Sequence, residues 1–326
     1  PLGSLGVLEE DIVRAAAAQG EEVPDFSKRA LLIFCADNGV VEEGVSQTGQ
    51  EVTAAVVSNM TRGRSCSCLM AEKAETDVFP IDMGIACEVE HRGELHPLTE
   101  RKIRRGTSNF TKAAAMTRQE VLTAILTGID AVRVLKEQGY RLSAVGEMGI
   151  GNTTTSSAVA SVLLQKDPEL VTGAGAGLDS AGLKRKTEAI WRGIGLHHPD
   201  PMDGMEVLQK VGGFDLAAMA GAFLGGAIYH VPVVIDGVIA AAAAAAAGRI
   251  APAATDYMLA AHVSAEPASI WLLDLIGVTP AIQAGLRLGE GTGALALFPL
   301  LDMALSIYRD MDTFAEMKIE EYKPLV

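Results

Sequence analysis

The chain has 326 residues, 49% of them hydrophobic, and its 34 glycines suit close packing of helices on a sheet in an α/β protein. The formal net charge of −14 argues against nucleic acid as a partner, because an acidic surface repels phosphate backbones. A long apolar run, 231–247, is interrupted by Asp236-Gly237 and is shorter than the ~20 residues that span a bilayer. It predicts a buried strand followed by a buried helix, and no membrane segment.

Four short apolar runs end in glycine or a polar residue, as strands covered on both faces do. They are residues 30–35, 77–81, 142–145 and 233–235. Helices are expected between and after them, at 118–138, 156–164, 183–194, 216–229, 265–275 and 294–311. This alternation predicts a doubly wound, mostly parallel sheet flanked by helices, with ligands bound at the rim formed by the carboxyl ends of its strands.

The two ends of the chain are charged and have helical patterns. We expect residues 5–28 and 302–326 to form a small helical layer together, since chain termini often lie close in space. Residues 29–301 are then a large α/β domain of Rossmann-like topology. Residues 1–4 resemble the remnant of a cleaved tag, and we expect no secretory signal.

The four cysteines are Cys35, Cys66, Cys68 and Cys87. The spacing of Cys66-Ser67-Cys68 is too tight for the usual CxxC pair, and no histidine clusters near it. We therefore expect buried or free thiols in a reducing cytoplasm. We expect no metal and no other cofactor.

The segment 149–155 follows a predicted strand and opens a predicted helix. Backbone N–H groups at a helix start, together with donors from Asn152 and Thr153, are typical of an anion site. The segment lacks the GK[ST] ending of a nucleoside-triphosphate loop, which argues against a kinase or ATPase. The alternative is an ordinary helix start with spare threonines.

Two further segments carry weaker signals of the same kind. A GxGxG turn at 173–177 precedes a helix with Lys184, Arg185 and Lys186, of which we expect at most one to point inward. Ser264 is either a capping residue or a second phosphate donor. His262 is as compatible with a core position as with a ligand.

Two carboxylates lie among glycines, Glu147 in the segment 146–151 and Glu290 in the segment 289–293. Glycine lets a backbone adopt turns that other residues avoid and lets a ligand approach closely. The alternative for Glu290 is a solvated loop carboxylate.

Taken together, the segments 146–154, 236–237, 262–266 and 286–294 resemble the nicotinate-nucleotide:dimethylbenzimidazole phosphoribosyltransferase family. Residues 36–40, 43–46 and 51–53 match the N-terminal pattern of that family, and the resemblance covers about 31–314. It implies transfer of phosphoribose from nicotinate mononucleotide to an aromatic base, giving an α-ribotide for cobamide synthesis.

The resemblance also implies roles for particular residues. Glu290 is the expected catalytic base, and Glu147 the expected carboxylate near the ribose. The expected phosphate- and nucleotide-binding residues are Gly149, Gly151, Asn152, Thr153, Lys186, Asp236, Gly237, Ser264 and Arg287. The expected lining of the aromatic-base pocket is Ser46, Met148 and Leu288. Family members form dimers, so we expect a homodimer, or a heterodimer with a paralogue.

The chemistry explains why one carboxylate base is enough. The nicotinate ring nitrogen is already cationic and departs neutral, so no general acid is needed, in contrast to glycosidases. The proton to be removed lies on the incoming base, and one carboxylate can take it. We expect apolar surroundings to raise the pKa of Glu290.

Three departures from the family pattern lie in the segments expected to shape the base pocket. Asn38 stands where the family usually has His. After Val52-Thr53 the family often has a glutamine, but this chain has Ala54-Ala55. Residues 63–67 replace a Gly-Gly-Ala-Ala-Ile run of the family. We therefore hypothesise an acceptor shifted toward phenolic bases such as phenol or p-cresol. Two alternatives from other classes are a non-catalytic partner subunit and a dinucleotide oxidoreductase. The latter would need GxGxxG after the first strand.

Overall fold

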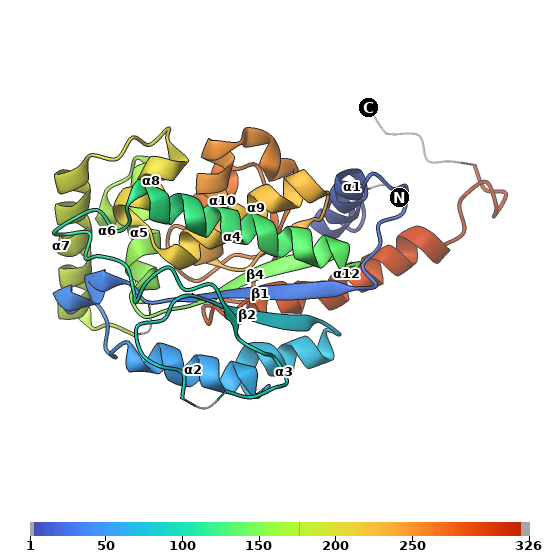
Figure 1. Ribbon diagram of the computed structural model, residues 1–326. Helices are drawn as coiled ribbons and strands as arrows, with labels where there is room; N and C mark the ends of the chain where they lie inside the picture. The colour runs from blue at the N-terminus through green and yellow to red at the C-terminus, as the bar shows by residue number, and fades with distance from the viewer. Residues whose placement is uncertain (1–2, 91, 176, 321–326) are drawn as a thin grey trace.

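The computed structural model describes residues 3–90, 92–175 and 177–320, and in them a seven-stranded sheet has helices on both faces (Figure 1). The strand order is β3-β2-β1-β4-β5-β6-β7, and each neighbouring pair is parallel. The strands are β1 (Arg29–Ala36), β2 (Asp77–Gly84), β3 (Thr99–Glu100), β4 (Leu142–Met148), β5 (Val233–Ile235), β6 (Met258–His262) and β7 (Pro280–Ile282). The predicted doubly wound α/β fold is confirmed.

The central strand β1 shows why both faces of the sheet are covered. Successive side chains of a strand point to opposite faces. In β1, Leu32 and Phe34 pack into one apolar core, while Leu31 and Ile33 pack into a second core on the other face. The continuous apolar run that predicted this strand therefore reflects burial on both sides.

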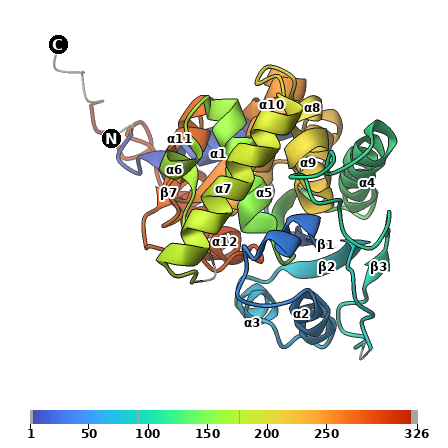
Figure 2. The ribbon, with the colours of Figure 1, turned by 90° about the vertical axis from the view of Figure 1, so that its left-hand side faces the viewer.

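Helices divide between the two cores. The first core is covered by α4 (Arg118–Glu137), α5 (Asn152–Leu164), α8 (Gly204–Val211), α9 (Phe214–Tyr229) and α10 (Val238–Ile250). The second is covered by α1 (Val7–Gln19), α2 (Glu51–Thr61), α3 (Cys66–Lys73) and α12 (Thr292–Asp310). The remaining helices are η1 (Gly39–Glu43), α6 (Pro168–Val171), α7 (Ser180–His197), η2 (Pro252–Tyr257) and α11 (Ser269–Leu275). Figure 2 shows α5 and α7 at the carboxyl end of the sheet.

Local sequence explains the longest helix well. Thr117 and Glu120 form a reciprocal capping box at the start of α4. Three-to-four spacing places apolar residues on one face of α4, where Ile129 is half-buried and the others are buried: Val121, Ile125, Val132 and Leu135. The apolar run 231–247 forms β5 and most of α10, as predicted. In the described part of the chain no helix is long and apolar enough to cross a membrane.

Three strands were not predicted. β3 is only two residues long, and β7 is a half-buried edge strand of three residues. β6 is fully buried, but its sequence, Met-Leu-Ala-Ala-His, contains no β-branched residue and so lacks the usual strand signal. The predicted helix 265–275 begins four residues late, at Ser269, for the chain first makes a turn around Ser264.

The C-terminal segment differs from the prediction. Helix α12 ends at Asp310, and 311–320 forms turns rather than the expected continuation of the helix to Val326. Met311 and Ile319 are exposed there, so the segment has no buried face to stabilise a helix. Residues 321–326 lie outside the described residues. α1 and α12 do pack together, but α12 begins at Thr292, within the proposed large domain, and the domain division stays a prediction.

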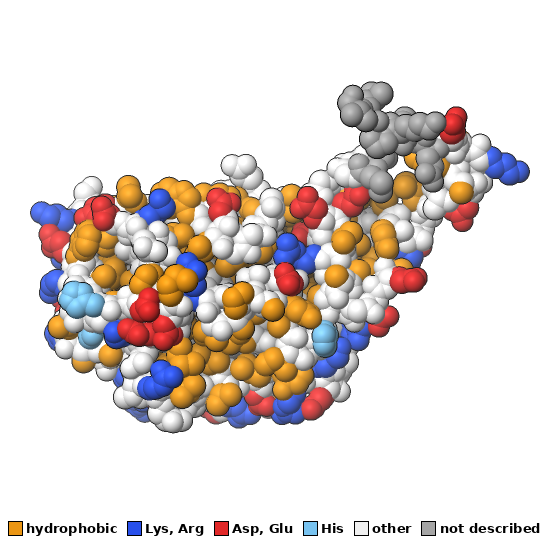
Figure 3. Space-filling view, turned by 90° about the horizontal axis from the view of Figure 1, so that it is seen from above, with side chains coloured by type: hydrophobic (Ala, Val, Ile, Leu, Met, Phe, Trp, Pro, Cys, Tyr) orange, Lys and Arg blue, Asp and Glu red, His pale blue; other side chains and the backbone are white. Residues whose placement is uncertain are grey.

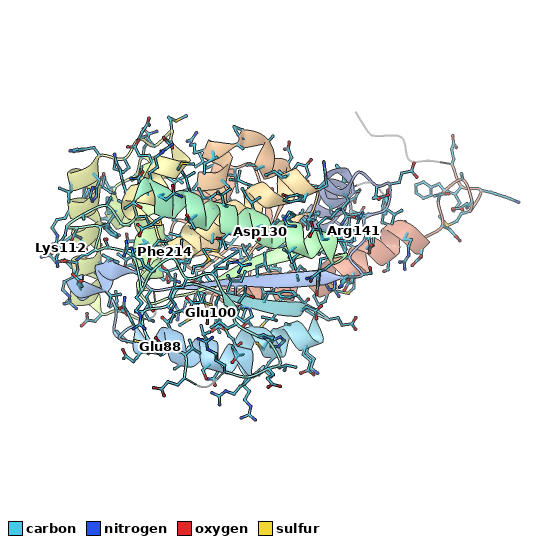
Figure 4. The ribbon with its side chains drawn as sticks, in the orientation of Figure 1. Glu88, Glu100, Lys112, Asp130, Arg141 and Phe214 are labelled. Atoms are coloured by element: carbon cyan, nitrogen blue, oxygen red, sulfur yellow. The ribbon has the colours of Figure 1, made fainter. Side chains whose placement is uncertain are left out.

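The sheet topology creates one special position for a ligand. Strand order reverses direction between β1 and β4, and in such sheets ligands bind outside the carboxyl ends at this point. Figure 4 shows the polarity of the sheet: Arg141, just before β4, lies near the amino end, and Phe214, at the start of α9, lies toward the carboxyl end.

Charges of both signs are scattered over the molecular surface seen in Figure 3.

Candidate active site

The loop that carries Glu290 has an uncommon backbone conformation. Gly289, Glu290 and Gly291 have φ angles of 85°, 59° and 80°, so three consecutive residues are left-handed. A Cβ at position 289 would lie 2.5 Å from Glu147 Oε1, and one at 291 would lie 2.3 Å from Leu31 Cδ1. Glycine is therefore required on both sides of this carboxylate by conformation and by space.

Asp236 holds this loop in place. From the end of β5, its side chain accepts hydrogen bonds from the backbone N–H groups of Gly291 (3.1 Å), Gly293 (2.6 Å) and Ala294 (3.2 Å). These N–H groups belong to the start of α12, so Asp236 satisfies donors that the helix itself leaves unpaired. It acts here as a structural clamp rather than as a free nucleotide-binding carboxylate.

The Glu290 carboxylate points toward the start of α3. Ser67 Oγ donates a hydrogen bond of 3.0 Å to Glu290 Oε2. Burial raises the pKa of Glu290 above its ordinary value, while hydrogen bonds from the side chain and backbone of Ser67 oppose the rise. The expected direction of the pKa shift is confirmed. The adjacent Leu288 is exposed, so the burial comes from other neighbours.

Glu147 lies beside the same loop, at the carboxyl end of β4. It is buried, and Asn152 Nδ2 donates a hydrogen bond to its Oε2. Burial, together with the charges of Asp215, Asp236 and Glu290, holds the pKa of Glu147 well above its usual range. This shift favours the neutral form of Glu147, whereas the hydrogen bonds from Ser67 oppose the effect of burial on Glu290, so we take Glu290 as the better base of the two.

At the start of α5, the backbone of Gly149 packs directly against the end of β1. A Cβ at Gly149 would lie 1.7 Å from the carbonyl oxygen of Ala36. Gly151, with φ of 95°, precedes the helix and has no side chain to cap it. Asp37 braces this turn by accepting a hydrogen bond of 3.2 Å from the N–H of Ile150. The N–H groups of Asn152 and Thr154 donate to the Gly149 and Gly151 carbonyls at 3.3 and 3.0 Å, and the N-terminus of α5 places the partial positive charge of the helix at the rim, as an anion site needs.

A buried lysine faces the same helix start. Lys186 is fully buried, and its Nζ donates to Thr153 Oγ1 (3.0 Å) and to the Gly173 carbonyl (3.1 Å). Burial lowers the pKa of Lys186 to about 8, against the opposing charge of Glu266. Lys184 and Arg185 are exposed, so one basic residue of the three points inward, as predicted.

Glu266 contacts the glycine-rich turn that lies beside Lys186. Its Oε1 accepts a hydrogen bond of 3.2 Å from the N–H of Gly175, in the GxGxG turn. Ser264 lies on the same loop, and its Oγ accepts from the N–H of Glu266 at 3.4 Å. Ser264 therefore makes the side-chain hydrogen bond to a nearby backbone N–H that is typical of a capping residue. The loop also brings its hydroxyl to the rim, where a Cβ at Gly237 would lie 3.9 Å from Ser264 Cβ.

His262 occupies a core position. It is buried, with Nε2 4.0 Å from Asp236 Oδ1. A Cβ at Gly293 would lie 2.0 Å from His262 Cδ2, so the ring packs directly against the start of α12. The interpretation of His262 as a core residue fits this environment better than a ligand role.

The expected base-pocket residues are less closely grouped. Met148 is half-buried beside the second core, and Ser46 is half-buried in the loop before α2, where its Oγ accepts from the N–H of Thr48 at 3.3 Å. Leu288 and Arg287 are both exposed. Of these four positions, two are therefore half-buried and two lie at the surface.

Several polar residues of the rim were not predicted as site residues. Asp37 accepts hydrogen bonds from Thr53 Oγ1 (2.5 Å) and from the N–H of Ala86 (2.8 Å), and so joins the ends of β1 and β2 to the first turn of α2. Asp215 is fully buried near Asn38, and burial raises its pKa to about 7. A strand-end position singled out Asp37, but Ser67 and Asp215 lie in helices whose sequence gives no such signal.

A cavity of about 740 Å³ lies elsewhere in the molecule. It is lined by residues of the N-terminal segment up to Ala18 and by Asp256 and Tyr257 of η2. Because η2 immediately precedes β6, this cavity is at the amino end of the sheet, opposite the rim that carries the two carboxylates. We therefore assign the candidate site to the rim.

Comparisons with known proteins agree with this geometry. A family model described as "Phosphoribosyltransferase" matches residues 1–319. The chain is 46% identical over 325 residues to the nicotinate-nucleotide–dimethylbenzimidazole phosphoribosyltransferase of Ruminiclostridium cellulolyticum, covering 100% of this chain and 91% of that protein. The protein of the same name from Clostridium acetobutylicum is 44% identical, with the same coverage. The crystal structure of CobT from Thermus thermophilus matches with a TM-score of 0.92 at 39% identity, covering 99% of this chain and 95% of that chain.

Proposed function

The chain belongs to the phosphoribosyltransferase family whose members are named nicotinate-nucleotide–dimethylbenzimidazole phosphoribosyltransferases, and we propose that it transfers phosphoribose from nicotinate mononucleotide to an aromatic base. The acceptor is 5,6-dimethylbenzimidazole or a related base, and the product is an α-ribotide that becomes the lower ligand of a cobamide. The chain is a transferase of the glycosyl-transfer type.

One observation supports the proposed chemistry most directly. Glu290 is half-buried at the carboxyl end of the sheet, in a loop whose conformation is fixed by two required glycines and by Asp236. A loop carboxylate that served only solubility would need neither the left-handed backbone nor the clamp.

In the reaction, one bond forms and one breaks at C1′ of the ribose. A nitrogen of the incoming base attacks C1′, and the electron pair of the broken bond passes to the nicotinate nitrogen, which departs neutral. The second nitrogen of the base loses its proton to Glu290, whose raised pKa makes it a better base than a solvated carboxylate. A phenolic acceptor would attack through oxygen and lose its O–H proton to the same group.

We assign the substrate phosphate to the start of α5 and Lys186. The helix N-terminus, Asn152 and Thr153 supply neutral donors, and Lys186 supplies a buried positive charge beside Thr153. Gly149, Gly151, Gly237 and Ser264 let the backbone and a hydroxyl approach. Fixing the phosphate orients C1′ without taking part in the chemistry.

Glu147 and the clamp residue Asp236 have supporting roles in this scheme. Glu147 accepts a hydrogen bond from Asn152, and burial raises its pKa, which favours the neutral form that donates a hydrogen bond to a ribose hydroxyl. Arg287 is the exposed basic residue next to the loop, and we assign it to the solvent side of the nucleotide. Ser46, Met148 and Leu288 are proposed to contact the aromatic base once it is bound.

We also propose the organisation that the sequence predicts. Of the predicted segments 5–28 and 302–326, α1 and the end of α12 form the small helical layer, supported by packing of α1 on α12. The active protein is a homodimer or a heterodimer with a paralogue. Its four cysteines are free thiols, as expected, which supports a cytoplasmic location.

The proposal is tested by incubating the purified chain with nicotinate mononucleotide and a panel of aromatic bases. The panel contains 5,6-dimethylbenzimidazole, benzimidazole, phenol and p-cresol, and products are identified by mass. We expect nicotinate release that depends on the added base, with a new ribotide for at least one base. A preference for phenol or p-cresol would support the acceptor shift, and a strong preference for dimethylbenzimidazole would rule it out. Failure of every base would contradict the proposed function and favour the non-catalytic subunit.

A further inference from the structure

On the basis of the proposed function, we infer that Ser67 is a positioning residue that orients Glu290 and favours its ionised form. Ser67 Oγ lies 3.0 Å from Glu290 Oε2, and Ser67 is fully buried. The two residues are 223 positions apart in sequence. Their contact therefore depends on the fold, which brings the start of α3 to the catalytic loop.

The hydrogen bond belongs to a chain with a defined direction. Ser65 Oγ lies 2.8 Å from Ser67 Oγ and accepts from the N–H of Cys68 at 3.2 Å, as the N-cap of α3. The only hydroxyl proton of Ser67 is used on Glu290, so Ser65 must donate to Ser67. Each donor in such a chain polarises the next. The result is a line of donors from a helix N-terminus to one carboxylate oxygen.

This arrangement fixes which oxygen takes the proton. Oε2 accepts from Ser67, so Oε1 is the oxygen that we assign to the N–H or O–H of the acceptor. A hydrogen bond to the ionised form also favours that form, which opposes the effect of burial on Glu290. Ser67 therefore controls both the orientation of the base and the pH below which it stops working.

Ser67 lies in a segment whose sequence departs from the family pattern. It stands in the segment 63–67, at the place of the Ile in the family run Gly-Gly-Ala-Ala-Ile. The unexpected segment thus reaches the reacting group itself.

The test compares Ser67→Ala, which removes the hydroxyl, with Ser67→Thr, which retains it. The matched control is Ser306→Ala. Ser306 is an exposed serine of α12, and its Oγ donates to the Met303 carbonyl. Glu290 is titrated by carboxyl ¹³C NMR, with its signal assigned by its loss in Glu290→Gln. The pH profile of kcat/KM is measured on the base that the wild type uses.

We expect Ser67→Ala to raise the pKa of Glu290 and to move the acid limb of the kcat/KM profile to higher pH. Its kcat should fall about 10-fold, less than the ~10²–10⁴-fold contribution of a general base, with KM for nicotinate mononucleotide unchanged. Ser67→Thr should restore both, and Ser306→Ala should match the wild type. If Ser67→Ala does not fold, Ser67→Cys, whose thiol is a weaker donor, replaces it.

The NMR titration separates the two proposals. A folded Ser67→Ala whose Glu290 titrates at the wild-type pH would overturn the role of Ser67, whatever the activity. Conversely, Glu290 could titrate at higher pH in Ser67→Ala than in the wild type while neither protein acts on any base. That result would uphold the coupling of Ser67 to Glu290 and refute the proposed function.

Discussion

At the scale of single residues, the backbone conformation of Glu290 is the clearest mark of function. A non-glycine residue in the left-handed region costs roughly 1–2 kcal/mol relative to a helical conformation. The hydrogen bonds from Gly291, Gly293 and Ala294 to Asp236 offset this cost and keep the loop in one conformation. Strain retained in this way is common at active sites, where it fixes a reacting group.

Lys186 provides a prediction at the same scale. Its pKa of about 8 means that it loses its charge as the pH rises through that value. The affinity for nicotinate mononucleotide, measured by calorimetry, should therefore fall between about pH 7 and pH 9. Lys186→Met should weaken binding about 10- to 100-fold at pH 7, the effect of losing one charge-assisted interaction.

Lys184→Met is the control for that variant. Lys184 is on the same helix, but its side chain is 78% exposed and pairs loosely with Glu188 at 3.8 Å. Its loss should leave the affinity and its pH dependence unchanged. Equal weakening by both variants would mean that Lys186 acts only through the net charge of the surface.

At the scale of elements, the start of α5 depends on contact between backbones. Gly149→Ala would place a Cβ 1.7 Å from the Ala36 carbonyl oxygen, so β1 and β4 would have to separate. We expect a loss of about 2–4 kcal/mol in the free energy of unfolding, measured by urea denaturation. Nucleotide binding should weaken as well, because the anion site opens with the turn.

Gly195→Ala is the matched control for the glycine test. Gly195 is an exposed position of α7, where a Cβ would meet nothing within 4 Å. The substitution should stabilise the chain by roughly 0.5–1 kcal/mol, since alanine favours the helical conformation. A Gly149→Ala variant as stable as the wild type would show that the turn can relax without cost.

Elements were predictable from sequence where packing and local signals agree. β1, with apolar residues facing both cores, and α4, with its Thr117–Glu120 capping box, were found within one residue of their bounds, whereas the start of β6 carries no strand signal. β7 and β3 are defined by pairing with neighbours, which a single sequence does not reveal. The predicted helix 294–311 is present to Asp310, but the helical pattern expected after it is absent from 311–320, where every side chain except that of Phe314 is exposed.

The candidate site was predictable in part for the same reason. Glycine-rich segments singled out Glu147, Glu290 and the start of α5 as candidates, and a doubly wound sheet brings the strand ends that carry Glu147 and α5 to one rim. Contacts across the fold were not predictable. The hydrogen bond from Ser67 to Glu290 and the clamp by Asp236 join segments that are 223 and about 55 residues apart.

Over the molecule as a whole, folding buries carboxyl groups both at the rim and in α1. Burial raises the pKa of Asp215 and of Asp11, in α1, to about 7, and raises those of Asp37 and Asp82 as well. A carboxyl that is protonated when folded and ionised when unfolded makes the unfolding free energy fall as pH rises. The acids with lowered pKa values have already ionised by about pH 5 and contribute no slope above it.

These buried acids predict that stability decreases between about pH 5 and pH 7. The slope is about 1.4 kcal/mol per pH unit for each carboxyl that stays protonated in the folded chain, before solvent relaxation reduces it. Calorimetry should show a higher Tm at pH 5.5 than at pH 7.5, and Asp215→Asn should flatten the profile. A Tm that rises across this interval would mean that these groups are ionised in the folded protein.

The most direct test of the central claim is the turnover of Glu290→Gln with saturating nicotinate mononucleotide and the preferred base. Glutamine keeps the shape and can accept the hydrogen bond from Ser67, but it cannot take a proton. We predict that kcat falls by roughly 10²-fold or more, with the Tm and the affinity for the nucleotide unchanged. Full turnover by a folded Glu290→Gln would contradict the assignment of Glu290 as the catalytic base.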